Sequence, residues 1–338
     1  MSLRPERLGT GCLLLCLCIQ LAQAVHSGWV SLALSFPYKS SKGVSTLFMP
    51  RSVSYAPEAY RVALPALIRF VGKILYLGDL TYIAAAIDFF TAFFALYLLY
   101  LTIVNSLPEN ARTRKERTLA ILAFLAILQF PLAWVVPSQR PETLPSALYL
   151  ALSIFSLAKI DTNNLWIAIL FIATLCQGFV RADVPFVFGI AVVVTGIWSG
   201  LTARLPFRRL LIISGGLIVV TSGGTQAYLQ FVRFPGLNYP PNVPIIQLGS
   251  NFVLHRLEIF TIALLPFLLF FVFLIVKRPR LNVIEVIVML ASLLYLPLWF
   301  TFGYVSEVRI YVPFLLALSA VVARVIATFL GVTIRTAS

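Results

Sequence analysis

The stretch VIEVIVMLASLLYLPLWFTF, residues 283–302, decides the class of fold. It is twenty residues long and holds a single charged side chain, Glu285. A helix of about twenty residues is about 30 Å long, which matches the hydrocarbon core of a lipid bilayer. The stretch therefore predicts a helix that spans a membrane.

Composition extends this prediction to the whole chain. Of the 338 residues, 60% are hydrophobic and 11% are charged, which a water-soluble domain of this length would not tolerate on its surface. The net charge of +14 would indicate nucleic acid in a soluble protein. Here the cations lie in short clusters between apolar runs, as the positive-inside rule requires. We expect the lipid bilayer as a partner, and no nucleic acid.

Apolar runs of similar length recur along the chain. The fold class we expect is an all-α membrane protein, a single polytopic transmembrane domain over residues 1–338, with about ten transmembrane helices. Three of these runs lie between Arg181 and Lys277. The others cover residues 11–36, 80–104, 118–136, 143–158, 165–179, 283–302 and 310–330.

Basic residues orient these runs. Fourteen of them fall in predicted cytoplasmic segments, against five in short outer loops, which places both termini in the cytoplasm of a cell that carries the protein in its inner (plasma) membrane. The triplet Ala22-Gln23-Ala24 also fits a cleavable signal peptide. Because the apolar character resumes at Trp29, we favour a retained first helix.

The first outer loop, residues 37–79, is predicted to contain a helix that lies in the membrane interface. Residues 61–77 carry apolar side chains at near-helical spacing, with Arg69 and Lys73 one turn apart. Those two cations would face lipid headgroups. They serve either as a plain lipid anchor or as part of a binding site.

Polar residues inside the apolar runs lead to further expectations. Asp88 lies well inside a run and should face the bundle rather than lipid. Arg324 is expected to snorkel to the inner surface, where solvent would also account for Glu285 and Asp161. The sequence Ser222-Gly223-Gly224-Thr225 is a candidate helix break. The four cysteines and two histidines show no metal-ligand or disulfide spacing.

Acidic and basic residues occur together at several predicted outer helix ends. Glu58 is either a helix-start charge or a catalytic carboxylate. Arg181 and Asp183 lie in a tight turn that should place both charges at the surface, where Asp183 could cap a helix or act in chemistry. The other charged residues we single out at these ends are Arg61, Arg256, Glu307 and Arg309.

The chain resembles the multi-spanning bacterial glycosyltransferases of the GT-C type, which use polyprenyl-phosphate sugars on the outer face. The resemblance covers the architecture of nearly the whole chain, including the long first outer loop with its interfacial helix. It also includes three short motifs: the segment Tyr60–Pro65, Arg181-x-Asp183, and Glu307-x-Arg309 before the last helix.

The resemblance implies transfer of a sugar from a polyprenyl phosphate to an acceptor hydroxyl on the extracytoplasmic side. Glu58 or Asp183 would be the catalytic base, and no cofactor is needed, although a divalent metal is optional. A transporter or flippase for a lipid-linked or anionic solute is the main alternative, and an assembly subunit is a third. The residues expected to bind substrate are Arg61, Arg69, Lys73, Arg181, Arg256, Glu307 and Arg309.

Overall fold

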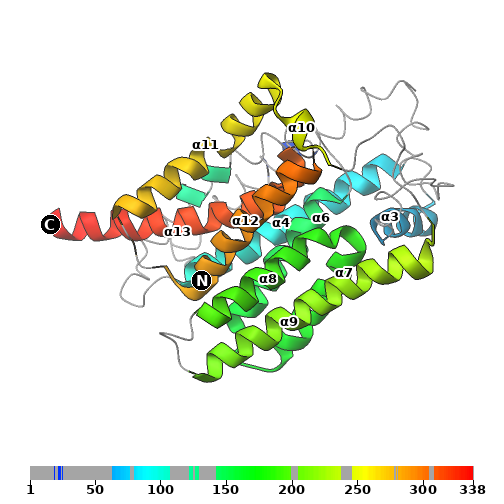
Figure 1. Ribbon diagram of the computed structural model, residues 1–338, viewed down its shortest axis with the longest axis horizontal. Coiled ribbons are helices and arrows are strands. Elements are labelled where there is room, and N and C mark those ends of the chain that lie inside the picture. Colours follow the sequence, from blue (N-terminus) through cyan, green and yellow to red (C-terminus); the bar gives the residue numbers. More distant parts are fainter. Residues whose placement is uncertain are drawn as a thin grey trace, which may run out of the picture.

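The computed structural model describes residues 63–76, 80–106, 142–198, 205–236, 246–277, 279, 281–303 and 308–337, with Ile19, Ala22, Gln23, Val25 and residues 122–124 and 126–128. Within these ranges every regular element is a helix, and no strand occurs (Figure 1). The expectation of an all-α protein is confirmed for this part of the chain.

In chain order the described helices are α3 (Ala63–Ile74), α4 (Leu80–Ser106), α6 (Thr143–Lys159), α7 (Leu165–Arg181), α8 (Asp183–Trp198), α9 (Leu205–Ala227), the π-helix η5 (Tyr228–Arg233), α10 (Leu248–Asn251), α11 (Leu254–Lys277), α12 (Val283–Phe302), the 3-10 helix η6 (Val308–Ile310) and α13 (Val312–Ala337). Short turns separate some of the described helices, such as α6 from α7 and α7 from α8.

Where the runs predicted from sequence are described, helices occupy them with small shifts at the ends. The run at 283–302 has the bounds of α12, and α4, α6, α7 and α13 each begin within two residues of their predicted run. Most of the predicted runs at 11–36 and 118–136 lies outside the described residues.

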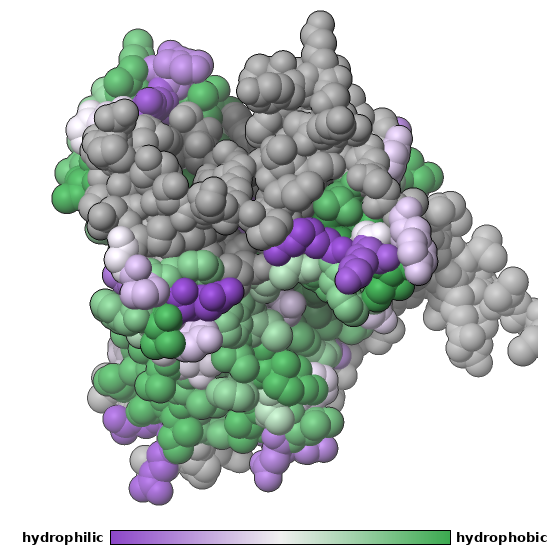
Figure 2. Space-filling view, turned by 90° about the vertical axis from the view of Figure 1, so that its right-hand side faces the viewer, coloured by the Kyte–Doolittle hydropathy of each residue, from purple (hydrophilic) through white to green (hydrophobic). Residues whose placement is uncertain are grey.

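Several helices are long and apolar enough to cross a membrane. Among the described residues there are four such spans, or five if α11, which bends by 47° between Leu265 and Phe267, counts as one. The bend falls at Pro266, as expected because proline has no backbone N–H to donate within a helix. The shorter helices α6, α7 and α8 are also apolar. In Figure 2 the coloured part of the face shown is mostly hydrophobic, with hydrophilic groups across its middle and at its lower edge. These features define a membrane protein.

Helix α13 packs against α4, α6 and α12, and its C-terminal end extends to the left edge of the molecule in Figure 1. Residues 311–325 are all buried, including the large side chains of Tyr311 and Phe314. A helix that is apolar on every side is expected to be surrounded by other helices. One hydrophobic cluster joins residues from α3 to α13, so the described helices share a single core.

Helices α8 and α9 form the most extensive helix pair, and glycines allow it. A Cβ atom on Gly215 of α9 would lie 2.7 Å from Val193 Cγ2 and 2.9 Å from the backbone oxygen of Gly189 in α8. Gly189 and Gly196 meet α9 equally closely. Small residues let helix backbones approach in this way in membrane proteins, where van der Waals contact drives association.

The candidate break at Ser222-Gly223-Gly224-Thr225 is wrong, because α9 runs through it to Ala227. The hydroxyl of Ser222 donates to the backbone oxygen of Ile218 (2.7 Å), and that of Thr225 donates to Thr221 (2.8 Å). Both hydroxyls therefore bond to their own helix and leave its backbone intact. The helix changes only after Ala227, where the π-helix η5 begins.

Helix α3 confirms the helical part of the prediction for residues 61–77. The helix packs against α4 and α7, and its Leu64 and Ile68 are buried, whereas Leu67, Phe70 and Lys73 are exposed. Apolar groups and a cation therefore lie on the outer surface of one helix. Asp88 of α4 is 1% exposed, which confirms that it faces the bundle.

Candidate functional site

A charged corner joins α7 and α8. Arg181 is the last residue of α7 and Asp183 the first of α8, with only Ala182 between them. Arg181 Nη2 donates to Asp183 Oδ2 at 2.6 Å, and Arg181 Nε lies 3.4 Å from Asp183 Oδ1. The guanidinium thus faces the carboxylate with two of its nitrogens, an arrangement stronger than a single charged contact.

The two partners differ sharply in exposure, because the Arg181 side chain is 4% exposed and that of Asp183 is 47% exposed. Inside the bundle, Arg181 Nη1 donates to the backbone oxygen of Ile310 (2.9 Å) and Nη2 donates to the hydroxyl of Tyr295 (2.5 Å). The expectation that both charges lie at the surface is wrong for Arg181. The corner turns its side chain inward, where acceptors from two other helical segments satisfy it.

This burial changes the role that Arg181 can have. Each of its three guanidinium nitrogens already donates within the protein, to Asp183, Tyr295 or Ile310. These bonds use four of its five N–H groups, and the side chain is 4% exposed, so a phosphate has little access to it. As arranged, Arg181 positions Asp183 rather than contacting a ligand itself.

Tyr295 of α12 also belongs to this corner, and the sequence did not reveal it. Its hydroxyl donates to Asp183 Oδ2 while it accepts from Arg181. Its ring centroid lies 4.6 Å from that of Phe314, and the side chain is 3% exposed. A tyrosine inside an apolar run has the sequence signature of a core residue, so no sequence signal distinguishes it.

Glu142, just before α6, adds a second carboxylate that attracts Arg181 electrostatically. Two carboxylates thus accompany one guanidinium, so the site carries a net negative charge. Negative charge favours hydrogen-bond donors over phosphate as ligands. No group of three His, Cys, Asp or Glu side chains able to hold a metal ion occurs in the described ranges. The optional divalent metal stays a prediction.

Only part of the predicted site can be located. Arg69 is half-buried and Lys73 exposed on α3, and Arg256 of α11 donates to the backbone oxygen of Ser250 at 2.9 Å. Of all the predicted site residues, the structure brings Arg181 and Asp183 into contact. Arg309 belongs to η6, with no side chain described. The residues Glu58, Arg61 and Glu307 lie outside the described residues.

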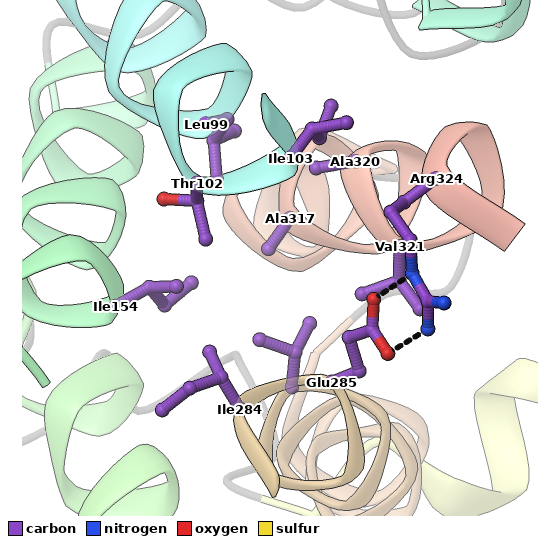
Figure 3. A pocket seen from close by; sticks show the side chains of 11 residues that line it. Leu99, Thr102, Ile103, Ile154, Ile284, Glu285, Ala317, Ala320, Val321 and Arg324 are labelled. Atoms are coloured by element: carbon purple, nitrogen blue, oxygen red, sulfur yellow. Dashed lines mark hydrogen bonds and ion pairs between the residues drawn. The ribbon is translucent and has the colours of Figure 1, made fainter. Parts of the chain in front are cut away.

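A second charged cluster lies between α12 and α13, ten residues before Tyr295 along α12. Glu285 and Arg324 form a two-pronged ion pair, with both side chains at most 7% exposed (Figure 3). The expectations that Arg324 snorkels and that Glu285 is solvated are therefore wrong, because each charge is neutralised by the other. Asp161, by contrast, is exposed as expected.

Glu285 also holds the start of α12. Its carboxylate accepts from the backbone N–H of Asn282 (2.8 Å), whose side chain accepts from the backbone N–H of Glu285 (2.9 Å). This is a capping box. A cavity of about 20 Å³ adjoins the ion pair and is otherwise lined mostly by aliphatic side chains of α4, α6, α12 and α13 (Figure 3). It has room for about one water molecule.

Comparison with protein-family models, with characterised proteins and with solved structures gives no match for this chain. The fold by itself defines a helical membrane protein in which, over the described ranges, two arginines are buried and each is held by a carboxylate from a neighbouring segment.

Proposed function

We propose that the protein is a membrane glycosyltransferase that moves a sugar from a polyprenyl phosphate to an acceptor hydroxyl. The observation that supports this best is the carboxylate of Asp183, half-exposed at a helix corner and held from behind by Arg181 and Tyr295. A general base needs both features, access to its substrate and a fixed direction.

In the proposed reaction, the acceptor hydroxyl attacks the anomeric carbon of the sugar and loses its proton to Asp183. The new glycosidic bond forms as the bond from that carbon to the phosphate oxygen breaks. The lipid phosphate leaves with the bonding electrons. Arg181 and Tyr295 keep the carboxylate in place. The net negative charge of the site favours a hydroxyl group, which donates a hydrogen bond, as the ligand.

The departing phosphate requires cations. Because Arg181 is engaged within the protein, we assign this role to cations elsewhere, among them Arg69, Lys73 and Arg256. In this proposal α3 lies in the outer membrane interface, where its exposed apolar groups meet lipid and Lys73 reaches headgroup phosphates. Arg61 and Arg309 stay candidates for the same role.

The proposal includes a topology of about ten helices, with both termini in the cytoplasm and Asp183 on the outer side. Cysteine in place of Arg114 or Arg208 should then be protected from an impermeant thiol reagent in intact cells, and cysteine in place of Asn242 should react. The unmodified protein, with its four natural cysteines, gives the background labelling. The reverse pattern would reject the orientation.

The function itself is tested with purified protein in lipid vesicles, supplied with polyprenyl phosphates carrying labelled sugars. We expect loss of label from the lipid and its appearance on an acceptor added at the Asp183 side. Absence of transfer from every donor, with folded protein and accessible acceptor, would count against a transferase.

One observation favours the second candidate, a transporter or flippase. Buried ionisable residues inside a membrane bundle often mark solute or proton pathways, and the Glu285–Arg324 pair adjoins a cavity. Movement of a labelled lipid-linked sugar between leaflets, without transfer of its sugar, would support this candidate.

A further inference from the structure

Gln177 of α7 carries a buried acceptor with no donor in the part of the chain that the structure describes. The residue is 0% exposed, and its Nε2 donates to the backbone oxygen of Ser146 at 3.0 Å. Its Oε1 has no hydrogen-bond partner. Nε2 also lies 3.4 Å from the hydroxyl oxygen of Ser146. Exchanging the two amide atoms would place Oε1 against the backbone oxygen of Ser146, which disfavours the exchanged orientation.

The place of Gln177 connects it to the charged corner. It precedes Arg181 by four residues on α7, about 6 Å along the helix, and Ser146 follows Glu142 by the same interval on α6. The polar pair Gln177 and Ser146 therefore forms the layer directly beneath Arg181 and Glu142.

Three hydroxyl oxygens are also buried without a partner among the described residues, but they differ from Gln177. They belong to Ser153, Ser156 and Thr195, each further along its helix from the charged corner. A hydroxyl can rotate to donate to a carbonyl of its own helix, whereas an amide oxygen can only accept. Compared with these hydroxyls, Gln177 combines an acceptor that has no donor with a position one helical turn from Arg181, the partner of Asp183.

We propose that Gln177 Oε1 accepts a hydrogen bond from a hydroxyl group of the bound sugar, in a subsite beneath Asp183. This rests on the proposed transferase function and adds a residue that selects the substrate. A site built to accept from a substrate hydroxyl discriminates strongly against sugars that lack it. A buried water molecule could donate the same hydrogen bond to Gln177 Oε1. The experiment distinguishes a sugar hydroxyl from water as the donor.

The test replaces Gln177 with methionine (Gln177→Met), which has similar length and makes no comparable hydrogen bond. We expect the transfer rate from labelled polyprenyl-phosphate sugar to fall roughly tenfold or more, with an unchanged or higher midpoint of thermal unfolding. The control is Thr174→Val. Thr174 is equally buried on α7, but its hydroxyl bonds to Leu170 of its own helix (2.7 Å), so transfer should be retained.

A folded Gln177→Met variant that transfers sugar within about twofold of the wild-type rate would overturn the subsite and assign the donor as water. If that variant does not fold, Gln177→Ala is judged by the same criterion. Loss of fold in both would assign Gln177 a structural role and overturn the proposal as well. The wild-type protein separates this outcome from failure of the proposed function. If it neither transfers the sugar nor shows a higher midpoint of thermal unfolding when the polyprenyl-phosphate sugar is added, the transferase function and the subsite are both rejected.

Discussion

Replacing Arg324 with methionine (Arg324→Met) is expected to lower the free energy of unfolding by about 3–5 kcal/mol. The change leaves the carboxylate of Glu285 buried, with its capping bond to Asn282 but without its cation. An unpaired buried charge is among the few causes of so large a loss. Denaturant titration of purified protein in mixed micelles, followed by tryptophan fluorescence, measures it.

Two further variants show whether the lost pairing is the cause. In the double variant Glu285→Gln with Arg324→Met, the glutamine can still accept the capping bond and no charge is left buried, so we expect most of the stability to return. Lys277→Met removes an exposed cation of α11 and its contact with the ring of Phe329, 5.9 Å from the centroid, so we expect a loss of less than about 1 kcal/mol. Equal losses in the single and the double variant would contradict an ion-pair origin.

The second large effect concerns the contact between α8 and α9. Gly215→Val should lower the free energy of unfolding by about 3 kcal/mol, because the first added carbon already falls 2.8 Å from the backbone nitrogen of Val193. A clash with backbone is relieved only by separating the two helices. The fraction of protein that stays monodisperse after heating, compared with the wild type, reports this loss.

The neighbouring residue supplies a matched control. Gly216 has nothing within 4 Å of its Cβ position, so Gly216→Val should be neutral or slightly stabilising. The two substitutions add the same atoms to adjacent positions of one helix. Similar destabilisation by both would show that valine in α9, rather than the close approach to α8, is responsible.

The helices that are described could be predicted because the bilayer fixes their length. The apolar run at 283–302 matches α12 without any knowledge of its neighbours, since about twenty residues are needed to cross the hydrocarbon core. Helix α3 could be predicted from its apolar spacing for a similar reason. Both signals are local in the sequence.

Contacts between helices could not be predicted in the same way. Tyr295 is 112 residues from Asp183, and Arg324 is 39 residues from Glu285. A run of apolar residues indicates that a helix is buried without indicating which side chain it meets. The sequence therefore placed Arg324 at the membrane surface, where an unpaired arginine would go, and offered no sign of its partner.

The corner at Arg181 shows that sequence-based prediction also fails for residues that are close together in the sequence. A turn of one residue between two helices predicted two surface charges, and Asp183 is indeed half-exposed. Arg181 differs because Tyr295 and Ile310 supply acceptors inside the bundle. Those acceptors come from α12 and the segment before α13, which no local pattern around Arg181 could reveal.

The most direct test of the central claim is the rate of sugar transfer by Asp183→Asn relative to wild type. Asparagine keeps the size of the side chain and cannot take up the proton, so the rate should fall about a hundredfold or more. Asp161→Asn, at an exposed carboxylate beyond the other end of α7, should transfer normally. Transfer by folded Asp183→Asn at nearly the wild-type rate would contradict the assignment of Asp183 as the base.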